Sequence, residues 1–331
     1  MTKFSLLDLA PISPEHGIEH ALSTVVDMAQ AAERSGYSRV WYAEHHNMPI
    51  IASSATSVLI AHVAAHTSTI RLGSGGIMLP NHAPLVIAEQ FGTLEALHPG
   101  RIDLGLGRAP GGDRNTLRAL RRNPMDADRF PQDIAELQGY LNGNTVIEGV
   151  HAIPGKGTHI PLYILGSSLF GAKLAAQLGL PYAFASHFAP QALHDALDVY
   201  RRDFQPSQQL SQPYVIAAMN AVAAPNTARA QTIFHDMLRH RLKALFLPPE
   251  VAATITDNQV DDILESPQGL QVRTMLKYTA VGTAEETRDW AHGFVQETQA
   301  DEIIVAHQAA DAAERVRSVE LFGQALLNNP V

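Results

Sequence analysis

Val40-Trp41-Tyr42-Ala43-Glu44-His45-His46 is a short apolar strand that ends abruptly in a carboxylate and two imidazoles. It is rich in β-forming residues and follows a predicted helix that stops at Gly36. Ionisable groups are costly to bury without partners, so packing alone does not explain this ending. Because side chains alternate along a strand, His45 and His46 point to opposite faces, and only one readily faces a shared site. Two interpretations remain open: hydrogen-bonded loop residues without chemistry, or residues of a catalytic site.

Strand and helix patterns alternate from one end of the chain to the other, and this alternation predicts the fold class. Eight strands are expected, each followed by a helix, with no shift in composition that marks a domain boundary. That pattern predicts an α/β protein built as a single (β/α)8 TIM barrel over residues 1–331. Residues 241–281 are too many for an ordinary loop, so we expect an insertion before the last strand that acts as a lid. The expected strands are residues 4–9, 38–43, 70–79, 101–107, 161–165, 181–186, 214–222 and 302–306; the expected helices are 17–35, 53–65, 84–97, 128–141, 170–178, 190–204, 227–240 and 310–327; residues 108–124 and 142–159 are expected to be irregular.

The composition excludes several classes of function. Twenty-four basic residues against 33 acidic ones give a formal charge of −9, which argues against nucleic acid or an anionic membrane as the main partner. Cysteine is absent, so disulfides, thiolate nucleophiles and cysteine-bound zinc are excluded, and a cytoplasmic location is expected. The chain starts with a predicted strand in place of a signal peptide, and no apolar run is long enough to span a membrane.

The carboxyl ends of the strands build the active site in a (β/α)8 barrel, and four of the predicted ends carry unusual residues. A glycine pair inside a strand lowers its stability, which indicates a close approach of the backbone to a ligand. Free backbone N–H groups at the start of a helix favour an anion. These strand ends are expected to converge on one site, and they carry Glu44-His45-His46, Gly75-Gly76, Arg108 and Gly166-Ser167-Ser168.

Two rival sites on an α/β protein fit the sequence less well. The glycines from Gly105 to Gly111 have the wrong spacing for a dinucleotide fingerprint, and Pro110 prevents an immediate helix. A metal hydrolase would carry a His-x-His pair at a strand end, and the chain has none. His62 and His66 have ligand spacing on a helix, but no catalytic glutamate lies between them. We therefore predict neither a nicotinamide cofactor nor a metal.

Taken together, these segments resemble the bacterial-luciferase-like family of flavin-dependent monooxygenases, and in particular its single-chain bacterial branch. The most specific parts are residues 40–46, 75–80 and 99–108, and the resemblance covers nearly the whole chain, with its weakest part over 241–281. It implies a (β/α)8 barrel and the cofactor FMN, bound in its reduced form.

The resemblance also implies roles for single residues. His45 matches the histidine that assists flavin oxygen chemistry, with Glu44 orienting it and His46, and the family's non-prolyl cis peptide falls on Gly75-Gly76. The flavin phosphate would meet Arg108 and the segment Gly166-Ser167-Ser168. There are two departures: Gly107 stands where the luciferase α subunit has a cysteine, and Phe170 replaces a threonine.

The sequence therefore predicts an FMN-dependent oxidoreductase, and within that class a monooxygenase acting on a small organic substrate with molecular oxygen. A separate flavin reductase would supply reduced FMN, and a homodimer is expected. Asp8 is expected to add a polar group to the site, and pairing of Arg108 with Asp113 is an alternative to phosphate binding. Two other functions remain open: hydride transfer with a deazaflavin, and flavin binding without catalysis.

Overall fold

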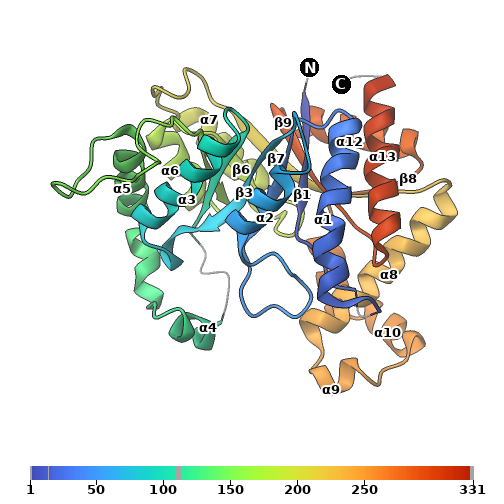
Figure 1. The fold of residues 1–331 in the computed structure, drawn as a ribbon. Helices are drawn as coiled ribbons and strands as arrows, with labels where there is room; N and C mark the ends of the chain where they lie inside the picture. Colours follow the sequence, from blue (N-terminus) through green and yellow to red (C-terminus); the bar gives the residue numbers. More distant parts are fainter. Residues whose placement is uncertain (1, 14, 109–112, 329–331) are drawn as a thin grey trace.

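The computed structural model describes residues 2–13, 15–108 and 113–328, and its centre is a closed parallel barrel (Figure 1). Within these residues the sheet order is β6-β5-β4-β3-β2-β1-β9-β7, and a further pairing of β6 with β7 closes it. This is the predicted (β/α)8 barrel, with an extra strand, β8, before the last one. The strands are β1 Lys3–Asp8, β2 Arg39–Tyr42, β3 Arg71–Met78, β4 Ile102–Gly107, β5 Leu162–Gly166, β6 Tyr182–Phe184, β7 Val215–Ala223, β8 Thr279–Gly282 and β9 Glu302–His307.

Helices cover the outside of the barrel because each carries one apolar face. In α1, Ala21, Val25, Met28 and Ala32 recur at helical spacing and are all buried. The helices are α1 Gly17–Arg34, α2 Thr56–Ala64, α3 Pro84–Leu97, α4 Arg114–Ala119, α5 Phe130–Asn142, α6 Leu169–Leu178, α7 Leu193–Asp203, α8 Thr227–Phe246, α9 Pro249–Ala252, α10 Asp257–Leu264, α11 Pro267–Met275, α12 Ala284–Thr298 and α13 Ala312–Asn328, with 3₁₀ turns at Leu79–Asn81 and Pro124–Arg129.

The strands are buried on both faces, as parallel strands between helices and a barrel interior must be. All nine residues of β7 are buried. One apolar cluster lies between the barrel and its helices, and a smaller one fills the barrel interior, where Leu7, Trp41, Tyr163 and Ile304 meet. The interior is therefore a packed core, and the space for a ligand lies at its end.

An ion-pair network crosses the barrel interior close to the amino ends of the strands. Arg39 on β2 donates to Asp103 of β4 at 2.7 Å and to Glu302 of β9 at 3.1 Å. Tyr163 accepts from the same guanidinium at 2.7 Å, and Tyr214 donates to Glu302 at 2.7 Å. Burial would lower the pKa of Arg39, but Glu302 and Asp103 outweigh it and raise that pKa.

The structure confirms the predicted insertion before the last strand and changes its bounds. Its proposed boundaries at 241 and 281 are wrong, because α8 continues to Phe246 and residues 279–282 form β8, which pairs with β7. The helix α12, whose amino end is capped by Thr283, was not predicted at all. A further helix, α4, lies in the segment that was expected to be irregular. Strand β8 is only four residues long, so a periodic pattern had little length in which to show.

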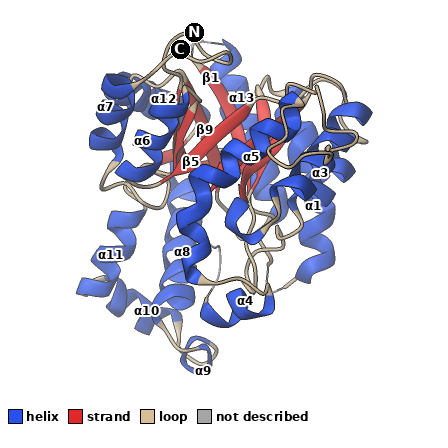
Figure 2. Cartoon of the chain, turned by 90° about the vertical axis from the view of Figure 1, so that its left-hand side faces the viewer, coloured by secondary structure: helices blue, strands red, loops and turns tan. Residues whose placement is uncertain are grey.

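The part of the insertion that is not sheet is a small helical layer with its own core. Met237 and Leu242 of α8 pack with Val260 and Leu264 of α10 and with Val272 of α11. Figure 2 shows α9, α10 and α11, together with α4, beyond the end of the barrel where the strands finish. This position suits a lid, and movement of the layer stays a prediction.

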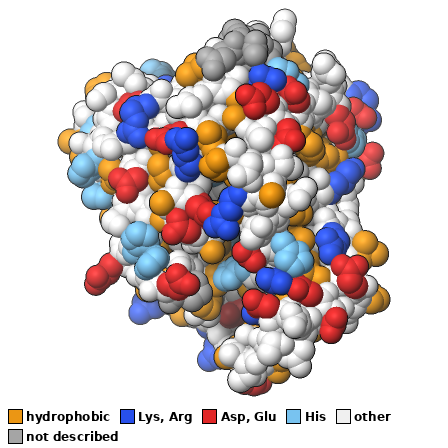
Figure 3. All heavy atoms as spheres, turned by 90° about the vertical axis from the view of Figure 1, so that its right-hand side faces the viewer, with side chains coloured by type: hydrophobic (Ala, Val, Ile, Leu, Met, Phe, Trp, Pro, Cys, Tyr) orange, Lys and Arg blue, Asp and Glu red, His pale blue; other side chains and the backbone are white. Residues whose placement is uncertain are grey.

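The surface is mixed in charge. Figure 3 shows acidic, basic and histidine side chains interspersed over the face it presents. In the part of the chain that the structure describes, no helix has both the length and the apolar character needed to cross a membrane.

Replacing Arg39 with methionine should lower the free energy of unfolding by about 3–5 kcal/mol, because Glu302 is then left buried without a cationic partner and Asp103 keeps only Arg71. Urea denaturation measures the change. Arg202→Gln is the control, since Arg202 pairs with Asp203 on the surface, and it should leave the unfolding free energy almost unchanged. Equal stability of Arg39→Met and wild type would show that the network does not hold the barrel together.

Candidate functional site

Glu44 is the centre of the polar groups at the end of β2. Its carboxylate is 1% exposed and accepts hydrogen bonds from His46 and His82, both at 2.8 Å. It also accepts from the backbone N–H of Met78 at 2.9 Å, where β3 ends. One carboxylate therefore fixes two imidazoles and joins the ends of two strands.

The hydrogen bonds to Glu44 decide its charge. Burial alone would raise the pKa of Glu44, but the bonds from His82, His46 and Met78 outweigh burial and lower that pKa. Glu44 is therefore ionised at neutral pH and serves as an acceptor. It positions its neighbours and has no proton to give.

His45 is held differently from His46. Its backbone N–H donates to the carbonyl of Ser53 at 2.9 Å, while its ring is half-buried. Among the described residues, its buried Nδ1 atom has no hydrogen-bond partner. Burial lowers the pKa of His45, and the nearby charge of Glu44 offsets this only in part. His45 is therefore a neutral imidazole at pH 7, and can accept a proton or a hydrogen bond.

The peptide bond between Gly75 and Gly76 is cis, as the family resemblance implies. A Cβ atom on Gly75 would lie 2.9 Å from side-chain atoms of Leu7 and Trp41, and one on Gly76 would lie 2.8 Å from the carbonyl oxygen of Gly105. The glycine pair is therefore explained by close packing within the barrel, and the inference that a ligand requires it is not needed. Gly75 is partly exposed, so binding of a cofactor there stays a prediction.

Arg108 and the start of α6 lie close together, although Arg108 follows β4 and α6 follows β5. The guanidinium of Arg108 sits over the Phe170 ring, with its central carbon 4.1 Å from the ring centroid. Ser167 and Ser168 are exposed, and Ser168 makes no side-chain cap on α6. Asp113, the alternative partner of Arg108, caps α4 instead by accepting from Asn115 and Thr116. Arg108, Phe170 and the N–H groups of α6 together form a cradle suited to an anion.

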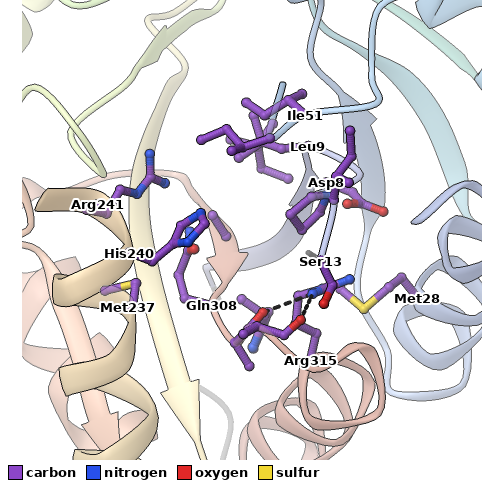
Figure 4. Close-up of a pocket in the computed structure, with 18 of the residues that line it drawn as sticks. Asp8, Leu9, Ser13, Met28, Ile51, Met237, His240, Arg241, Gln308 and Arg315 are labelled. Atoms are coloured by element: carbon purple, nitrogen blue, oxygen red, sulfur yellow. Dashed lines mark hydrogen bonds between the residues drawn. The ribbon is translucent and has the colours of Figure 1, made fainter. Parts of the chain in front are cut away.

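A cavity opens between the ends of β1 and β9 and the side of α8 (Figure 4). Asp8 is the predicted site residue that lines it. Burial raises the pKa of Asp8 despite a backbone hydrogen bond from Ala10 and the charge of Arg315. Glu44, His45, Gly75 and Arg108 do not line this cavity, so the residues predicted to share one site are not all brought together in this pocket.

Three functional candidates were missed by sequence reasoning. His82 follows β3 and His187 follows β6, so the rule that selected residues just after strand ends would have found both. His187 is buried, and burial together with the charges of Arg241 and His45 lowers its pKa to about 3. Arg241 is on α8, and no sequence signal distinguishes it from the other arginines of that helix.

A closed parallel barrel with ionisable groups gathered at the carboxyl ends of its strands is typical of barrel enzymes. Residues 2–302 match the family of luciferase-like monooxygenases, and the chain belongs to this family. A luciferase-like monooxygenase of Escherichia coli strain K12 is 48% identical over 324 residues, which cover 96% of this chain and 95% of the relative. An N-acetyl-S-alkylcysteine monooxygenase of Bacillus subtilis strain 168 is 29% identical over 341 residues, with 99% of each chain covered.

Solved structures agree with this assignment. The structure of apo-MsnO8 is 32% identical, with a TM-score of 0.83 and 100% of both chains covered. The oxygenating constituent of a 3,6-diketocamphane monooxygenase of Pseudomonas putida, solved with FMN, is 15% identical, with a TM-score of 0.75 and 100% of both chains covered. An F420-dependent secondary alcohol dehydrogenase is 16% identical, with a TM-score of 0.70 and 98% of both chains covered. The last two show the shared fold alone.

Replacing Glu44 with glutamine should lower the free energy of unfolding at pH 7 by about 1–3 kcal/mol, because two imidazoles and a backbone N–H lose a charged acceptor. The lowered pKa of Glu44 sets the pH dependence of this effect. The stabilisation that ionised Glu44 contributes is fully present above pH 4.5, the ordinary pKa of a glutamate, and is lost as the pH falls through the lower pKa of the folded protein. The difference between variant and wild type should therefore shrink below pH 4.5. Denaturant titrations at several pH values measure it.

Glu297→Gln is the matched control, because Glu297 pairs with His194 at 2.9 Å on the surface. It should change stability little at any of these pH values. A constant difference between Glu44→Gln and wild type down to pH 3 would mean that the charge of Glu44 is not what stabilises the strand end.

Proposed function

We propose that this protein is an FMN-dependent monooxygenase that acts on a small organic substrate with reduced FMN and molecular oxygen. Membership of the luciferase-like monooxygenase family supports the reaction class. We also propose that a separate reductase supplies the reduced flavin and that the protein works as a cytoplasmic homodimer.

The residues at the strand ends fit FMN chemically. Arg108 would bind the phosphate together with the free N–H groups at the start of α6, because a guanidinium fork and a helix amino end both favour a dianion. The backbone at Gly75, which is partly exposed, would lie against the flavin ring. Reduced FMN, when bound, supplies two electrons, so that one atom of oxygen goes to the substrate and the other becomes water.

The observation that carries the proposal is the free Nδ1 atom of His45. His46 is occupied by Glu44, whereas His45 is half-buried, neutral at pH 7 and unpaired at Nδ1 within the described residues. A neutral imidazole in that setting can accept a proton during the reaction and return it. The insertion beyond the strand ends would help to exclude water.

The F420-dependent relative keeps a second candidate open, which is hydride transfer with this deazaflavin and without oxygen. A flavin-binding protein without catalysis is a third, but it would have no need of a general base at His45. Oxygen uptake with reduced FMN and a substrate separates these three. Consumption coupled to substrate oxygenation supports the proposal, and its complete absence with every flavin would contradict it.

Replacing His45 with alanine should reduce oxygenation by roughly 10²–10⁴-fold, the usual contribution of a positioned acid or base. Because burial lowers the pKa of His45, the active neutral form persists below pH 6.5, the ordinary value, and the acidic fall in wild-type rate should lie below that pH. The pH profile of kcat/KM for oxygenation measures both effects.

His66→Ala is the control, since His66 is exposed in the turn that follows α2, and it should leave the rate and the profile unchanged. An His45→Ala enzyme with the wild-type rate would remove His45 from the mechanism. A variant that fails to fold, as judged by circular dichroism, would favour a purely structural role.

FMN should bind more tightly than riboflavin by about 2–4 kcal/mol, because charge-assisted hydrogen bonds contribute about 1.5–3 kcal/mol each and do not add fully. Arg108→Ala should remove much of that difference, because the phosphate loses its guanidinium partner. Arg118→Ala, an exposed arginine of α4, should keep it. Fluorescence titration with both ligands decides the matter, and an unchanged preference in Arg108→Ala would place the phosphate elsewhere.

A further inference from the structure

Arg241 projects from α8 into the cavity at the end of the barrel. Figure 4 shows its guanidinium and the His240 ring leaving α8 on the side of the cavity, with Leu9 and Ile51 across the space. The side chain is half-buried, and burial lowers its pKa. A guanidinium held away from water in this way is costly unless an anion compensates it.

Among residues 2–13, 15–108 and 113–328, Arg241 makes no hydrogen bond or ion pair through its side chain. Two carboxylates line the same cavity, but both have other interactions. Asp236 pairs with Arg239 at 3.3 Å, and Asp8 accepts from the backbone of Ala10 and interacts with Arg315. Within the described residues, therefore, no carboxylate forms an ion pair with Arg241.

The positive charge of Arg241 acts on the histidines that lie near it. Its charge contributes to lowering the pKa values of His45, His187 and His240, each of which burial lowers first. Arg241 is thus the cation shared by the cavity and by the histidines at the strand ends. An anion drawn to it would lie in the cavity and near His45.

The rest of the cavity wall is mostly apolar. Leu9, Ile50, Ile51 and Met237 line it, while Gln308 adds an amide that donates to Asn220 at 3.0 Å. Arg315 also lines the cavity, but it donates to the carbonyls of Ala309 and Ala310 and lies beside Asp8. A pocket with an apolar wall and an unpaired guanidinium matches a ligand with a hydrocarbon body and an anionic head group.

We propose that Arg241 is the residue that selects the substrate, by binding the carboxylate or similar anionic head group of a small organic acid whose apolar part lies against Leu9, Ile51 and Met237. This assignment rests on the proposed monooxygenase function. Arg108 and the start of α6 already offer a cradle for the flavin phosphate, so Arg241 is left for the substrate.

Calorimetric titration of the full chain with hexanoate and hexanamide at pH 8 tests the proposal, because the two probes share a body and differ in charge. Wild type should bind hexanoate at least about tenfold more tightly, which is about 1.4 kcal/mol. Arg241→Gln should bind the two probes equally, and Arg241→Lys should keep part of the preference. Arg229→Gln is the control on the same helix, because Arg229 donates to Glu314 at 2.8 Å on the surface, and it should keep the full preference.

The same titrations with saturating FMN separate a substrate subsite from a cofactor subsite. Hexanoate should still bind, and Arg241→Gln should leave FMN affinity within about twofold of wild type. Displacement of hexanoate by FMN, no hexanoate binding by wild type, or an unchanged preference in a folded Arg241→Gln would each overturn the proposal. Since no step needs reductant or oxygen, a protein that binds hexanoate through Arg241 but consumes no oxygen would refute the monooxygenase function separately.

Discussion

The guanidinium of Arg39 is the interaction on which the closed barrel depends. It lies inside the barrel and bridges Asp103 and Glu302, which come from strands on either side of it, so three strands share one buried charge. Its carboxylate partners are fully buried, and loss of the arginine would leave Glu302 without a cationic partner and Asp103 with Arg71 alone. Because this network occupies the amino end of the interior, ligands are confined to the opposite end.

The two ends of the barrel treat their polar groups in opposite ways. At the amino end the charge of Arg39 is balanced by Asp103 and Glu302, and its guanidinium also donates to the hydroxyl of Tyr163. At the carboxyl end, within the described residues, His45 and His187 each keep a buried ring nitrogen without a partner, and Arg241 keeps an unpaired charge. Unsatisfied groups destabilise a fold, so their concentration where the strands finish indicates groups reserved for ligands.

The sequence predicts the fold well where patterns are long and local. The strand and helix alternation predicted the barrel, and the polar residues after β2 placed the candidate residues Glu44 and His45 at a strand end. The insertion was harder, because β8 is defined by its pairing with β7 and not by a pattern of its own. Arg241 was equally difficult to predict, since what distinguishes it is the lack of an ion-pair partner among the described residues. Such an absence is a property of three-dimensional packing, and one sequence does not contain it.

Arg241 also links the pocket to the chemistry at His45. Its positive charge is one of the causes that lower the pKa of His45, after burial and alongside the charge of His46, while Glu44 acts in the opposite direction. If an anionic head group binds Arg241, it cancels that charge, and the imidazole becomes more basic. The protonation state of His45 would then depend on whether the substrate is present. Substrate binding would in this way prepare the base at the moment when the reaction needs it.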